Sequence, residues 1–72
     1  MNKRNNWQNL LRLANEALNP KGISITLTND GDGFYKCEIT VDGKTETYAE
    51  NYYEDELSDL VTEAWHDANA KK

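Results

Sequence analysis

Cysteine and histidine, which form the disulfides, metal sites and many catalytic sites of small domains, are almost missing from this chain. Its 72 residues contain one cysteine and one histidine. Cys37 has no partner for an internal disulfide, and together with His66 it does not supply the ligand set of a structural zinc site. We therefore predict no metal, no cofactor and a reducing, cytoplasmic compartment.

Long hydrophobic runs are also missing. The first residues, MNKRNNWQNLL, include basic side chains but no apolar stretch of the length that a signal peptide or a membrane span needs. We therefore expect no membrane contact. A chain of 72 residues is long enough for one small core, so we expect a single domain over 1–72.

Basic residues are absent from one long stretch. The net charge of the chain is −5, and from Glu46 to Asp67 there is no lysine or arginine. Eight acidic residues lie in that stretch: Glu46, Glu50, Glu54, Asp55, Glu56, Asp59, Glu63 and Asp67. Such a surface repels phosphate, which argues against nucleic acid as a direct ligand. Solvated helix faces also carry acids for solubility alone, but they usually mix both signs of charge, so we expect a binding role.

Helical spacing of hydrophobic residues predicts a first helix in NNWQNLLRLANEALNP. The stripe contains Trp7, Leu10, Leu11, Ala14, Ala17 and Leu18, with Leu13 at its border. Asn5 followed by Gln8 is typical of a capping box, and Pro20 with Gly22 marks the end of the helix.

A second stripe predicts a last helix in NYYEDELSDLVTEAWHDANAKK. Its members are Tyr53, Leu57, Leu60, Val61, Ala64, Trp65 and Ala68. Asn51 is the expected cap, with Glu54 three residues further on. We interpret both Trp7 and Trp65 as core residues, because each lies on an apolar stripe.

Alternation of hydrophobic and polar residues predicts three strands between the helices. The first contains Ile23, Ile25 and Leu27 on one face. The faces of the second are Tyr35, Cys37, Ile39 and Val41 on one side and Phe34, Lys36, Glu38 and Thr40 on the other. Cys37 is therefore expected to be buried and unreactive.

The third strand, KTETYAEN, follows the turn residues Asp42-Gly43 and has two candidate registers. With a two-residue loop, the residues on the Val41 side of the sheet are Lys44, Glu46 and Tyr48. With a three-residue loop and a bulge, they are Thr45, Thr47 and Ala49. We favour the bulged register, because it keeps charged side chains out of the core and leaves Tyr48 and Phe34 on the open face of the sheet.

The predicted element order is α-β-β-β-α. A sheet with one apolar face and two amphipathic helices that each need one partner favour an α+β fold. We expect a three-stranded antiparallel sheet with both helices packed on one face, and the opposite face left open.

The segment TNDGDGF, at 28–34, is similar to part of a calcium-binding loop. With Gly33 at the central glycine position of an EF-hand, Asp30 and Asp32 occupy ligand positions, but the first and last positions lack carboxylates. Asn, Asp and Gly are also the ordinary residues of a turn. We interpret the segment as a turn whose aspartates form the edge of an acidic surface.

No catalytic group is predicted. His66 falls on the polar side of the last helix, without partners at helical spacing that acid-base or metal chemistry would need. We therefore expect that the chain is not an enzyme.

The element order, with ITVDGKTETYAEN leading into the last helix, resembles that of a double-stranded RNA-binding domain over most of the chain. That family carries lysines at the start of its last helix to hold phosphates. This chain has Glu54, Asp55 and Glu56 there. RNA binding is therefore not implied.

The chain also looks like the small acidic phage anti-CRISPR proteins that inhibit type II CRISPR nucleases. The shared features are a short first helix, three strands of which the third is acidic, and a last helix with a tryptophan near its end, here Trp65. The resemblance implies carboxylates that imitate DNA phosphates and occupy a basic groove that normally receives the duplex.

From the charge and this resemblance we expect a small acidic protein-binding domain, phage-encoded, that acts as a DNA mimic on a host defence protein such as a CRISPR nuclease. The expected partner-binding residues are Asp30, Asp32, Glu46, Tyr48, Glu50, Tyr52, Glu54, Asp55, Glu56 and Asp59. A monomer is favoured. The alternative is an assembly module that pairs as a homodimer through its open sheet face, with Phe34 and Tyr48 as contacts.

Overall fold

A computed structural model describes residues 6–71 and has the element order that the sequence predicts. In chain order the elements are α1 (Trp7–Leu18), the 3-10 turn η1 (Asn19–Lys21), β1 (Ile23–Asn29), β2 (Tyr35–Val41), β3 (Lys44–Tyr52), the 3-10 turn η2 (Glu54–Glu56) and α2 (Leu57–Lys71). Neither helix in this part of the chain has the length and apolar composition that crossing a membrane requires.

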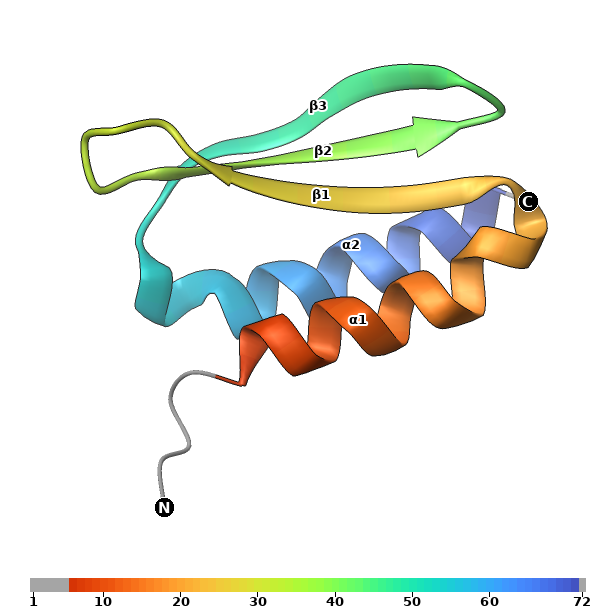
Figure 1. Cartoon of the computed structure of the whole chain (residues 1–72), viewed down its shortest axis with the longest axis horizontal. Coiled ribbons are helices and arrows are strands. Elements are labelled where there is room, and N and C mark those ends of the chain that lie inside the picture. Colours follow the sequence, from red (N-terminus) through yellow and green to blue (C-terminus); the bar gives the residue numbers. More distant parts are fainter. Residues whose placement is uncertain (1–5, 72) are drawn as a thin grey trace.

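The elements form two layers, which confirms the predicted α+β fold. The sheet is antiparallel with strand order β1-β2-β3, and both helices lie on one side of it (Figure 1). The helices pack against each other and against β1, while β3 packs against β2. The helix layer is therefore displaced toward β1.

The core lies between the helices and the first two strands. Its buried hydrophobic residues are Trp7, Ala14, Leu18, Ile23, Ile25, Cys37, Ile39, Leu57, Leu60, Val61, Ala64 and Ala68. β3 contributes no fully buried residue. Cys37 is buried as predicted. Its burial, and to a smaller extent the negative charge of Glu38, raises the pKa of its thiol to about 11. Ala17, predicted on the apolar stripe of α1, is exposed.

β3 takes the register that the sequence analysis did not favour. Val41 pairs with Lys44 across a two-residue turn in which Asp42 and Gly43 have φ angles of 53° and 86°. Positive φ at both central residues is typical of the type I′ hairpin turn. Lys44 and Glu46 therefore lie on the Val41 side of the sheet, but both are exposed because no helix covers β3 there.

A bulge further along β3 then shifts by one residue the alternation that decides which side chains face the core. Glu38 pairs with Thr47 and Cys37 with Ala49, which leaves Tyr48 as an extra residue in the third strand. Ala49 thereby returns to the core side, as the bulged register predicts. Tyr48 packs against the core instead of lying on the open face, so its predicted position is wrong.

α2 begins later than predicted. The first turn is preceded by Tyr53, whose O accepts from Glu56 N at 2.9 Å and whose N donates to Glu56 Oε1 at 2.9 Å. Asn51, the predicted cap, lies in β3 with a φ of 65°. Tyr53 is 56% exposed, so its place on the apolar stripe is also wrong. At the other helix, the predicted cap Asn5 lies outside the described residues.

Side chains of α1 and η1 bind the backbone of β1. Asn15 Nδ2 donates to Ile25 O at 3.0 Å, and Asn15 Oδ1 accepts from Ile25 N at 2.8 Å. Asn19 Nδ2 donates to Ile23 O at 2.9 Å. These bonds satisfy backbone N–H and C=O groups of β1 that point away from β2, as such groups do along the edge of a sheet. The β1 edge of the sheet is therefore closed at Ile23 and Ile25.

The substitution Asn15→Ala is expected to lower the free energy of unfolding by about 1–3 kcal/mol, because it leaves the part-buried N–H and C=O of Ile25 without partners. Chemical denaturation followed by circular dichroism measures the loss. The control is Asn9→Ala in the same helix, where the amide oxygen contacts Arg12 at the exposed surface. That change is expected to stay within about 0.5 kcal/mol, and equal losses for the two variants would contradict the role of Asn15.

Candidate protein-binding surface

The predicted partner-binding residues separate into two parts of the surface. The loop at 30–34 and η2 lie at the same end of the sheet, because β3 ends with Tyr52 paired to Tyr35 at the start of β2 (Figure 1). Glu46 and Tyr48 lie further along, toward the hairpin turn. Exposed Glu50 lies on β3 between them.

An aromatic contact joins the two acidic segments at that end. The acidic end, as we name it, consists of Asp30, Asp32, Glu54, Asp55, Glu56 and Asp59, and all six are exposed. The ring of Phe34 lies against the ring of Tyr53, with 4.9 Å between centroids. Asp30 N donates to Phe34 O at 3.0 Å, and Tyr53 is bonded to Glu56. The loop acids and the η2 acids therefore belong to one continuous surface.

The loop is built as a turn, as the sequence predicts. Gly31 N donates to Asn29 Oδ1 at 2.8 Å, and Asp32 N donates to Asp30 Oδ1 at 3.2 Å. Both acceptor side chains thus serve the local backbone, as Asn and Asp commonly do in turns. Within residues 6–71, no group of three or more His, Cys, Asp or Glu side chains is arranged to hold a metal ion.

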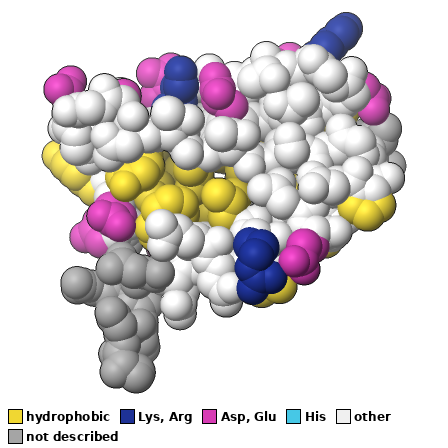
Figure 2. Space-filling view, viewed as in Figure 1, with side chains coloured by type: hydrophobic (Ala, Val, Ile, Leu, Met, Phe, Trp, Pro, Cys, Tyr) yellow, Lys and Arg dark blue, Asp and Glu magenta, His cyan; other side chains and the backbone are white. Residues whose placement is uncertain are grey.

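Within the part of the chain that the structure describes, no basic side chain forms an ion pair with the acidic end. Among the described residues, the ion pairs are Arg12 with Glu16 at 3.0 Å and Lys36 with Glu38 at 3.7 Å, and neither pair includes an acid of this end. Figure 2 shows acidic side chains on both sides of a band of hydrophobic side chains at this end of the molecule. The surface therefore combines negative charge with apolar area.

The exposed aromatic side chain at this end is Tyr53, which is not among the contact residues predicted from the sequence. Tyr52, a predicted contact residue, is half-buried against the core, whereas Tyr53 is 56% exposed. Trp7 is buried, stands edge-on to Tyr35 at 5.7 Å, and directs Nε1 to Glu54 Oε2 at 3.5 Å. One sequence signal could have shown that Tyr53 does not belong to the apolar stripe of the last helix. It stands directly before three acidic residues, which are typical of the first turn of a helix.

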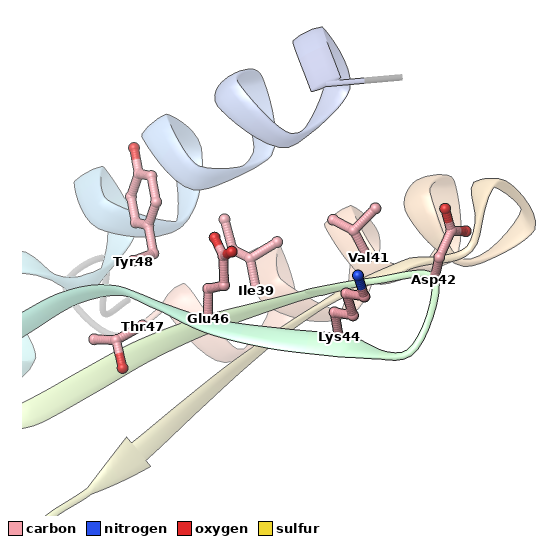
Figure 3. Close-up of a pocket in the computed structure, with 7 residues that line it drawn as sticks. All are labelled: Ile39, Val41, Asp42, Lys44, Glu46, Thr47 and Tyr48. Carbon is pink, nitrogen blue, oxygen red and sulfur yellow. The ribbon is translucent and has the colours of Figure 1, made fainter.

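A groove of about 370 Å³ lies on the helix-facing side of the β2–β3 hairpin. Ile39 and Val41 line it from β2, and Lys44, Glu46 and Tyr48 line it from β3. Figure 3 shows these side chains pointing to the side on which α2 lies, while Thr47 points away. The bulged register favoured from the sequence turns Lys44, Glu46 and Tyr48 to the other face of the sheet, so this groove was not predicted.

Tyr48 connects the groove to α2. Its hydroxyl donates a hydrogen bond to Asp67 Oδ2. This bond, partial burial, and the charges of Asp67 and Glu63 together raise the pKa of Tyr48 to about 12, because each disfavours the phenolate. The bond links β3 to α2, which is the helix on the β3 side of the helix layer.

The face of the sheet away from the helices is polar. The hydroxyls of Thr40 and Thr45 share a hydrogen bond of 2.7 Å across it, and the half-buried ion pair of Lys36 and Glu38 lies on the same face. Tyr48 does not lie on this face. Pairing of two copies through it stays a prediction, without the aromatic contact that Tyr48 was expected to supply.

Tyr48 gives a test of this geometry at alkaline pH. Its folded-state pKa of about 12 exceeds the ordinary value of 10.0, so the stability contributed by its bond is complete below pH 10 and is lost as the pH rises toward 12. Tyrosinate absorbance of the folded protein is expected to show an ionisation at about pH 12 that Tyr48→Phe removes. The control Tyr53→Phe should retain it. Survival of this step in Tyr48→Phe would show that another phenol is responsible.

Comparison of the chain with models of protein families, with curated proteins and with solved structures found no match. The resemblances to double-stranded RNA-binding domains and to anti-CRISPR proteins therefore stay predictions. The function must be inferred from the surface itself.

Proposed function

We propose that the chain is a small, non-enzymatic, cytoplasmic protein-binding domain whose acidic end covers a basic, nucleic-acid-binding surface of another protein. The proposal is carried by one observation: the six exposed carboxylates of the acidic end have no ion-pair partner among the described residues. Carboxylates without ion-pair partners repel each other in the free protein, and a cationic partner surface relieves that repulsion.

The contact between Phe34 and Tyr53 supports a protein partner rather than a simple counterion. Aromatic rings that are flanked by charges supply apolar area at the centre of a contact, where binding energy is usually concentrated. An arginine side chain suits such a site, because its guanidinium pairs with carboxylates and stacks on rings. In this proposal the carboxylates occupy the positions of phosphates, and the rings add contacts that a nucleic-acid backbone lacks.

A CRISPR nuclease of type II is the partner class that we propose within this function, with the chain as a phage-encoded inhibitor. Such nucleases hold a guide–target duplex in a positively charged channel and bind its backbone rather than its sequence. An acidic surface of this kind competes for the channel. Its association should be fast and should slow as salt shortens the range of the electrostatic field from about 10 Å at 0.1 M to about 3 Å at 1 M.

The triple variant Glu54→Lys, Asp55→Lys and Glu56→Lys tests the proposal. Circular dichroism of the free triple variant checks that it still folds, because acidic residues in the first turn of a helix stabilise that helix by about 0.3–1 kcal/mol each. We expect the unchanged chain to reduce duplex binding by a guide-loaded type II nuclease at low salt. The triple variant should lower the association rate by about tenfold or more.

A matched control reverses three acids outside the acidic end, Glu16, Glu38 and Glu63, and so changes the net charge equally. It is expected to retain most of the inhibition. Equal loss in both variants would show that only net charge matters, and no effect of the unchanged chain at low salt would refute this partner class.

Capture from bacterial lysate at low and at high salt then tests the wider proposal that the partner is a nucleic-acid-binding protein. Capture of such proteins that high salt releases supports the proposal, and their absence contradicts it.

A further inference from the structure

The two edges of the sheet differ in how their backbone groups are used. The β1 edge is closed at Ile23 and Ile25 by Asn15 and Asn19. β3 forms the other edge. Val41 and Lys44 are the hydrogen-bonded pair next to the two-residue turn, and such pairs alternate along an antiparallel ladder with pairs that turn their N–H and C=O groups outward.

Thr45 and Thr47 are the residues of β3 in outward-turned positions. They alternate with Lys44 and Glu46, and each is paired to β2 in the regular part of the ladder before the bulge. Among the hydrogen bonds of residues 6–71 outside the ladder, none involves the backbone of Thr45 or Thr47. This edge can therefore accept a further strand.

The groove lies directly beside this open edge. Residues opposite each other in neighbouring strands place their side chains on the same face of a sheet. Glu46 points to the groove side, and Thr47 points away from it (Figure 3). A residue of an added strand that lies opposite Glu46 would therefore place its side chain at the groove, against the apolar surface of Ile39 and Val41.

The charges around the groove select the kind of side chain. Glu46 lines it, and Glu63 and Asp67 lie close enough to act on the hydroxyl of Tyr48. Lys44 is the basic residue among those that line it. An apolar floor, a tyrosine ring and an excess of carboxylates suit the long stem and charged head of arginine or lysine.

We propose that β3 binds an extended basic segment of a partner protein by strand addition, with an arginine or lysine opposite Glu46 entering the groove. In strand addition, backbone hydrogen bonds supply affinity, and pockets for alternate side chains supply specificity. A second copy of this chain is a poorer occupant, because each copy carries a net charge of −5. The edge and groove are separate from the acidic end, so the proposal does not rest on the proposed function.

The probe is a short, blocked peptide of alternating arginine and threonine, titrated into the ¹⁵N-labelled protein at moderate salt. Two matched peptides separate the causes of binding. In one, glutamate replaces arginine, which reverses the charge. In the other, proline replaces threonine, which keeps the charge but removes backbone donors. We expect saturable shifts of the Thr45 and Thr47 amides with the arginine–threonine peptide, and much smaller shifts with the other two.

Two variants and one control variant test the contacts within this site. Glu46→Gln should weaken binding of the arginine–threonine peptide about twofold to fivefold, the size of a cross-strand pair of opposite charges. Thr45→Pro should weaken it about threefold to tenfold by removing one outward donor, since proline is tolerated on an edge strand where its N–H would face solvent. Asp59→Asn, the same change of charge at the acidic end, should leave the affinity unchanged.

Each alternative outcome has a distinct pattern. Equal shifts with the arginine–proline peptide would overturn strand addition in favour of simple charge attraction. Absence of saturable shifts at Thr45 and Thr47 would overturn the proposal, as would shifts that depend on protein concentration without peptide, which would assign this edge to a second copy. Loss of binding in Asp59→Asn would place the peptide at the acidic end instead.

Discussion

The register of β3 is the constraint on which the rest of the structure depends. The turn at Asp42 and Gly43 pairs Val41 with Lys44, so Lys44 and Glu46 lie on the helix-facing side of the sheet. To bury either charge without a partner would cost several kcal/mol, roughly as much as a domain of this size has in total. Helices that cover this part of β3 are therefore excluded, and the helix layer packs against β1 instead. The groove and the open edge are consequences of that displacement.

The displaced helix layer also explains why the two sheet edges differ. α1 lies close enough to β1 for Asn15 to bind both backbone groups of Ile25, whereas α2 contacts β3 through Tyr48 and Asp67. The β1 edge is thereby closed at Ile23 and Ile25 by side chains of the helix layer, whereas the β3 edge is left open beside a groove. The acidic end forms at the opposite end of β3, where the chain leaves the sheet and starts η2. Both surfaces carry excess negative charge, and both therefore favour basic partners.

Much of the fold could be predicted from the sequence, because the hydrophobic periods of the helices and of the first two strands are clear. The register of β3 could not be predicted. A bulged loop is favoured only if the Val41 side of the sheet is buried along the whole length of β3, and it is not. The structure keeps Lys44 and Glu46 out of the core by leaving that face uncovered, and places the bulge later, at Tyr48. Tyr53 was misplaced because helical spacing does not show where a helix begins. The acids of the site were visible in the sequence, but the aromatic contact of Phe34 with Tyr53 depends on tertiary structure.

Residue-resolved amide hydrogen exchange tests most directly whether the sheet is closed at Ile25 on the β1 edge and open at Thr45 and Thr47 on the β3 edge. Ile25 and Thr45 both turn their N–H groups away from β2, but Asn15 accepts the bond of Ile25. We expect a strongly protected amide at Ile25 and fast exchange at Thr45 and Thr47 under conditions where the amides of Cys37 and Ile39 are protected. Exchange at Thr45 as slow as at Ile25 would contradict it, because the β3 edge would then be covered.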